Sequence, residues 1–122
     1  MKIINFIAVF VLVSLVFLSC ADTKNNQLII GKWKGASWES NGKAVKRNVE
    51  TTFFTFDEKG TYIFENNGTV EAGTYKVEID NLYTTAKDKQ EIMVKIVKLT
   101  NDSLVFDMNN GGQAEMLTLV KK

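Results

Sequence analysis

Turn-forming residues recur along the chain at short, fairly even intervals, and this spacing constrains the fold more than any other feature. The segments between the turns are rich in β-branched and aromatic residues, as in ETTFFTF, TYIFE and EIMVKIVKL, and none has a helical period. Seven turns predict eight strands, and consecutive strands joined by tight turns run antiparallel. The seven signals are Asn41-Gly42, Asp57–Gly60, Asn67-Gly68, Asp80-Asn81, Lys87–Lys89, Asn101–Ser103 and Asn109–Gly112.

A meander of eight strands has two free edges unless it closes on itself. Exposed edges pair with other chains, and the sequence contains no proline that would block such pairing. We therefore predict an all-β fold, an eight-stranded antiparallel up-and-down barrel over residues 28–122. A two-sheet sandwich built from the same strands is the alternative. One predicted strand runs from Val49 to Phe56.

The first 19 residues differ sharply from the rest of the chain. Lys2 precedes an apolar run from Ile3 to Leu18 that only Asn5 and Ser14 interrupt. A basic start, an apolar stretch of this length and a small residue before a cut site are typical of an export signal. Residues 1–19 are therefore interpreted as a cleaved signal peptide. The alternative is a retained membrane helix, for which the run is borderline short.

The end of this leader carries the only cysteine of the chain. Phe17-Leu18-Ser19-Cys20 resembles the lipobox of bacterial lipoproteins, in which a cysteine follows an apolar pair and a small residue. The resemblance implies cleavage before Cys20 and attachment of fatty acids to its sulfur, which would anchor the protein to a membrane of the cell envelope. Residues 20–27 then form a flexible tether. Ala21 after the cysteine implies the outer membrane by the enterobacterial sorting pattern, and the face of that membrane stays open.

The charge of the exported part argues against nucleic acid as a partner. Once Lys2 leaves with the leader, 14 basic side chains remain against 14 acidic ones. A chain with no net charge lacks the field that gathers a polyanion.

The residue inventory also argues against catalysis. The chain has no histidine, and its single cysteine is assigned to the anchor. Histidine-based triads and histidine metal sites are thereby excluded, and the carboxylates are scattered singly. We expect no enzyme activity, no metal and no cofactor.

Four short motifs spread over the exported part point to a family. They are Gly31-Lys32-Trp33, Phe56–Tyr62, Gly73–Tyr75 and Leu99–Leu104. Together they resemble the small lipocalin-like domain of bacterial envelope lipoproteins, over about residues 28–121. In lipocalins the tryptophan that matches Trp33 plugs the closed end of the barrel, and a late arginine packs over it. This chain has Lys121 and Lys122 near that place instead.

The resemblance implies a small hydrophobic ligand inside the barrel, with Trp33 closing the base. An eight-stranded barrel is just wide enough to hold one small ligand or to be filled by side chains. The many inward-facing aromatic residues favour core packing over ligand contact. The alternative function is therefore an interaction or inhibitor lipoprotein with a filled barrel, which binds another envelope protein through its surface or loops. The candidate wall residues are Phe54, Phe56, Tyr62, Phe64 and Tyr75.

Overall fold

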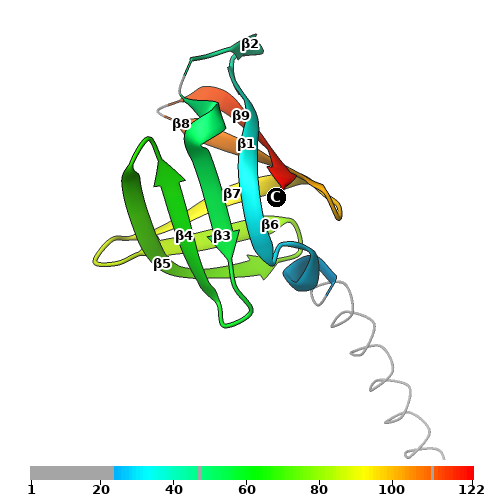
Figure 1. Cartoon of the computed structure of the whole chain (residues 1–122), viewed down its shortest axis with the longest axis vertical. Coiled ribbons are helices and arrows are strands. Elements are labelled where there is room, and N and C mark those ends of the chain that lie inside the picture. The colour runs from blue at the N-terminus through cyan, green and yellow to red at the C-terminus, as the bar shows by residue number, and fades with distance from the viewer. Residues whose placement is uncertain (1–23, 47, 111) are drawn as a thin grey trace, which may run out of the picture.

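The computed structural model describes residues 24–46, 48–110 and 112–122, and they form an all-β structure (Figure 1). Residues 24–28 are helical, and Val49–Thr51 form a single 3-10 turn, η1. The strands are β1 (Gly31–Ser40), β2 (Lys43–Ala44), β3 (Thr52–Phe56), β4 (Thr61–Asn66), β5 (Thr69–Glu78), β6 (Asn81–Ala86), β7 (Glu91–Leu99), β8 (Ser103–Asn110) and β9 (Gln113–Lys121).

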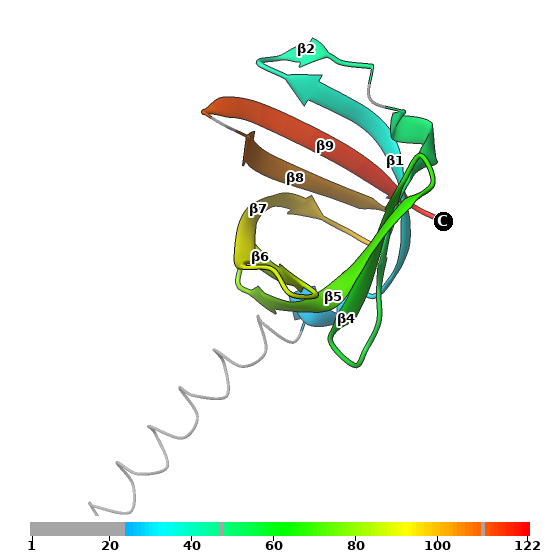
Figure 2. The same cartoon turned by 90° about the vertical axis from the view of Figure 1, so that its left-hand side faces the viewer.

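Eight of these strands close into the predicted antiparallel barrel. Strands β3 to β9 pair in chain order, β1 pairs with β3, and β9 pairs back onto β1 from Trp33 opposite Lys121 to Ser40 opposite Glu115. The two-residue β2 only extends β1 as a short hairpin. The prediction of a closed barrel is confirmed, and the alternative sandwich is wrong (Figure 2).

The predicted strand from Val49 to Phe56 is only partly present, because its first three residues form η1. The backbone amide and the hydroxyl of Thr51 both donate to the carbonyl of Asn48, which holds the turn. This turn packs beside β1 at Gly35, where an added Cβ would lie 2.3 Å from the carbonyl oxygen of Val49. Because Gly35 has no side chain, η1 can pack directly against β1 just before β3 begins.

A bulge in β1 changes which side chains face inward. The register with β9 shifts between Gly35 and Ser37, so Ala36 is an extra residue in the strand. Trp33 and Trp38 are five residues apart, and regular alternation would put them on opposite faces. The bulge restores Trp38 to the interior side, opposite the buried Leu117.

One end of the barrel is closed by the segment that precedes β1. Ile29 and Trp33 are both fully buried there, and the indole N–H of Trp33 donates to the carbonyl of Ile29 at 2.8 Å. The helical residues 24–28 lie across this end, beside the turn between β5 and β6 (Figure 2). The predicted flexible tether, residues 20–27, is thus described only from residue 24, and that part is helical.

Candidate functional site

The opposite end of the barrel is open, and it holds a pocket. We call this end the mouth. The mouth pocket has a volume of about 220 Å³, and its walls come from β1, β7, β8 and β9. Most of its side chains are apolar, and one is a carboxylate. It is lined by Trp38, Ile92, Met93, Val94, Met108, Asn109 and Glu115.

Glu115 and Trp38 form the polar part of this pocket. The indole N–H of Trp38 donates to Oε1 of Glu115 at 2.8 Å, and Glu115 is only 1% exposed. Glu115 faces inward because it continues the alternation of Leu117 and Leu119 along β9. A buried carboxylate requires hydrogen-bond donors around it, so Trp38 both shapes the wall and holds the acid in place.

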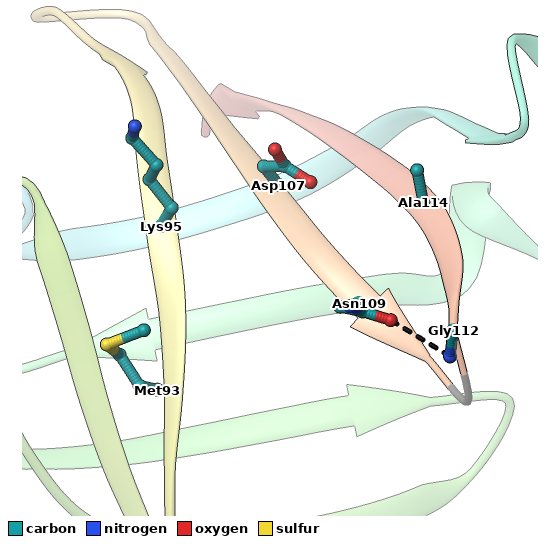
Figure 3. Close-up of a pocket in the computed structure, with 6 residues that line it drawn as sticks. All are labelled: Met93, Lys95, Asp107, Asn109, Gly112 and Ala114. Atoms are coloured by element: carbon teal, nitrogen blue, oxygen red, sulfur yellow. Dashed lines mark hydrogen bonds between the residues drawn. The ribbon is translucent and has the colours of Figure 1, made fainter.

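The wall of the barrel divides between β7 and β8 at the mouth. The ladder between these strands ends at Lys95 opposite Asp107. Beyond that pair, Met93 lies opposite Tyr83 of β6, and Asn109 lies opposite Ala114 of β9. The two strands therefore diverge, as Figure 3 shows.

A second hollow lies on the outer side of this division. It has a volume of about 380 Å³ and shares Met93 and Asn109 with the mouth pocket. The side-chain oxygen of Asn109 accepts a hydrogen bond from the backbone amide of Gly112 at 3.0 Å, which braces the turn between β8 and β9 (Figure 3). Met93 lines both hollows and Ile92 lines the mouth pocket, and their side chains are 55% and 60% exposed.

Three of the six aromatic residues singled out in the sequence are buried toward the closed end. Trp33, Phe56 and Tyr62 belong to the hydrophobic core. The ring of Phe56 lies 6.4 Å from that of Tyr62, measured between centroids. These side chains fill the part of the barrel next to its closed end. The mouth stays open.

The other three aromatic residues are half-buried and pack against that core. The ring of Phe54 lies 4.7 Å from Phe64 and 5.7 Å from Phe106. Tyr75 packs edge-on against Phe56 and donates its hydroxyl to the carbonyl of Asp57 at 2.6 Å. The six predicted residues thus lie close to one another, but the mouth pocket is lined by other side chains.

A second carboxylate interacts with the aromatic core. The hydroxyl of Tyr62 donates to Oε2 of Glu71 at 3.1 Å, and Lys89 lies 3.7 Å from Oε1 of the same carboxylate. Burial, reinforced by the negative charge of Glu71, raises the pKa of Tyr62 to about 12. The phenol therefore remains a neutral donor at physiological pH.

The described residues contain no group of three or more acidic, cysteine or histidine side chains that could hold a metal ion. In the same part of the chain, no helix has the length and apolar character needed to cross a membrane. Cys20, the predicted lipidation site, and the predicted signal peptide lie outside the described residues.

Comparison with known proteins places this architecture in a family. Residues 29–106 match the family of lipocalin-like domains. A lipocalin-like protein from Bacteroides uniformis has a similar structure, with a TM-score of 0.64 and 17% identity over 77% of this chain and 98% of that one. An uncharacterized protein from Bacteroides eggerthii has a TM-score of 0.60 and 20% identity over 77% and 99%. No curated protein matches the chain. At these identities the two structures support the fold, whereas the family match covers more than half of the sequence, so the chain belongs to the lipocalin-like domain family.

Proposed function

We propose that this protein is a lipid-anchored lipoprotein of the bacterial cell envelope whose barrel binds a small, largely hydrophobic molecule at the mouth. The observation that carries the ligand site is the mouth pocket, an apolar hollow with one buried carboxylate. Ligand sites are typically concave and apolar with a few placed polar groups, and this pocket has that composition. The sequence lacks the combinations of residue types found at the common catalytic sites, which favours a binding function over an enzymatic one.

The pocket restricts the size and chemistry of the ligand. A volume of about 220 Å³ lies below the range of about 300 to 1,000 Å³ that is common for ligand sites. The occupant is therefore compact, or it extends through the division between β7 and β8 toward the outer hollow. Glu115 favours a molecule that offers a hydrogen-bond donor or a positive charge to its carboxylate.

A titration with a small apolar amine tests the ligand site. Binding of 1-aminoanthracene to the exported domain is followed by its fluorescence, and we expect saturation at one molecule per barrel. Val94→Phe fills the pocket from its wall and should weaken binding at least tenfold. Val120→Phe adds the same volume on the outer face of β9, where Val120 is exposed, and should leave binding unchanged. Equal affinities in the two variants would contradict a site at the mouth.

The anchor is tested separately from the ligand site. We expect mass spectrometry of the native protein to find a chain that begins at Cys20 and carries fatty acids. Cys20→Ala should remain soluble or keep its leader, because the thioether can form only on sulfur. Unchanged membrane association and unchanged mass in this variant would contradict the lipoprotein assignment.

A protein partner is the second candidate function. It is favoured by the exposed Ile92 and Met93 near the place where β7 and β8 separate. Beyond Lys95 and Asp107, the backbone groups on the facing sides of these two strands no longer pair with each other. Such edges can accept an added strand. A photo-crosslinking residue at Met93 should capture one envelope protein in whole cells, while the same group at Ile63, exposed on β4, should not. Capture of the same protein from both positions would contradict recognition at the division.

A further inference from the structure

We propose that the closed end of the barrel docks on the membrane, with the side chain of Ile79 inserted among the lipid headgroups and the mouth directed away from the bilayer. This inference rests on the lipid anchor at Cys20 of the proposed function. It adds an orientation and a second membrane contact, neither of which the anchor alone requires.

The length of chain between the anchor and the barrel limits the distance to the membrane. Residue 24 begins the described structure, so only residues 21–23 separate it from Cys20. Even when fully extended, this segment spans at most about 14 Å from Cys20 to Lys24. A short connection of this kind keeps the following helix close to the lipid surface.

The helix is fastened to the closed end and cannot swing away as a free linker would. The side-chain amide of Asn25 donates to the carbonyl of Ile79 at 2.5 Å, and that of Asn26 donates to the carbonyl of Val77 at 3.4 Å. These contacts bind residues 24–28 to the end of β5. The turn that holds Ile79 therefore lies beside the helix that follows the short connection to the anchor.

Ile79 is an unusual residue for this turn. Its φ is 58°, and the other non-glycine residues described with positive φ are asparagine or aspartate: Asn41, Asn48, Asn67 and Asp88. A β-branched side chain fits this conformation poorly, whereas asparagine tolerates it. Ile79 is also 67% exposed, so packing within the barrel does not compensate for the strain. Insertion into the lipid surface would remove this exposed apolar side chain from water.

The mouth lies at the other end of the barrel. Val70, near the start of β5, is 62% exposed there, which is close to the exposure of Ile79 in the turn that follows the other end of the same strand. A membrane contact at Ile79 therefore leaves Val70 and the mouth pocket in water. Ligands would reach the pocket from the aqueous side and not from the bilayer.

Site-directed fluorescence tests this orientation in the full lipidated protein. In that form Cys20 is blocked, so a second cysteine is the only free thiol. Asp80→Cys labels the Ile79 turn without removing Ile79, and Val70→Cys is the matched control at the mouth. The labelled proteins are reconstituted in phosphatidylcholine vesicles with brominated acyl chains. We expect quenching by the brominated lipid to be severalfold stronger at position 80, and quenching by aqueous iodide to be stronger at position 70.

Two further measurements decide what a negative result means. Flotation with the vesicles and the mass of the lipidated chain test the anchor itself, and a chain that neither floats nor carries lipid overturns both proposals. If the chain floats but positions 70 and 80 are quenched equally, the docking proposal alone is overturned. Adding Ile79→Asn to Asp80→Cys should reduce lipid quenching severalfold, since asparagine retains the turn but not the apolar contact. Unchanged quenching in that double variant would remove Ile79 from the membrane contact.

Discussion

The ammonium of Lys121 lies 4.5 Å from the ring centroid of Trp33 and closes the base of the barrel. It also donates to the carbonyl of Ile30 at 2.6 Å. In the lipocalins that the sequence resembles, an arginine packs over the corresponding tryptophan, and here a lysine occupies that place. Gly31 makes the arrangement possible, because its φ is 133° and an added Cβ would lie 2.7 Å from Cε of Lys121.

Loss of the Lys121 cap should destabilise the barrel. Lys121→Ala removes a cation–π contact and a hydrogen bond, so we expect the free energy of unfolding to fall by about 1 to 2 kcal/mol. Lys122→Ala is the matched control, because Lys122 lies 5.0 Å from the ring of the half-buried Phe53 on the outer surface. Its effect should stay below about 0.5 kcal/mol. Urea denaturation of both variants provides the comparison, and equal losses would contradict a specific role for Lys121.

The strained turn at Ile79 should become more stable when its side chain suits the backbone. In the domain without residues 1–20, Ile79→Asn should raise the free energy of unfolding by about 1 kcal/mol, since asparagine adopts positive φ at lower steric cost. The reverse change, Asn67→Ile, places isoleucine at a φ of 50° in the turn between β4 and β5 and should lower stability by a similar amount. Thermal unfolding measures both. If Ile79→Asn lowered stability, the strain argument would be wrong.

Alkaline pH should destabilise the domain through Tyr62. Its pKa is about 12 in the folded protein, against an ordinary value of 10.0. Between these values the unfolded chain loses the phenolic proton while the folded chain retains it, so stability falls as pH rises from 10 to 12. Burial raises the pKa of Tyr75 as well, so it acts in the same direction.

Substitution of Tyr62 should isolate its share of this dependence. Tyr62→Phe should cost about 0.5 to 1.5 kcal/mol at neutral pH, because Glu71 loses a donor, and it should flatten the loss of stability above pH 10. Urea midpoints at pH 8, 10 and 11 show both effects. A variant with the same alkaline slope as the parent would show that other groups cause it.

The hydrogen bond between Trp38 and Glu115 should support both the fold and the pocket. Trp38→Phe leaves the buried carboxylate without the indole donor, so we expect a loss of about 1 to 3 kcal/mol in the free energy of unfolding, together with weaker binding of 1-aminoanthracene. Glu115→Gln keeps an oxygen acceptor for Trp38 and should cost less. A larger loss in Glu115→Gln than in Trp38→Phe would contradict this assignment.

The sequence contained enough information for the barrel but not for its mouth. Turn signals such as Asn67-Gly68 have strong backbone requirements, and both residues have positive φ, at 50° and 86°. The number of strands follows from these turn signals, and the closure of the barrel follows from the tendency of exposed sheet edges to pair with other chains. Trp38 could not be placed in the same way, because one extra residue, Ala36, reverses the alternation along β1 and leaves no sequence signal.

Glu115 could have been found from the sequence. It precedes Leu117 and Leu119 by even steps, so alternation assigns it to the interior despite its charge. Val49–Thr51 illustrate the opposite difficulty, because β-branched residues there favour a strand while contacts with Gly35 and Asn48 hold a 3-10 turn. Tertiary packing prevailed over local preference in that segment.

The pairing of β9 with β1 means that the barrel cannot close until β9 is present. A chain trimmed by a protease before Gln113 would leave β1 and β8 as open edges over most of their length. Such edges recruit other strands and lead to aggregation. Loss of β9 would therefore open the whole barrel, so a truncation within this strand is a greater hazard than a deletion in any of the turns.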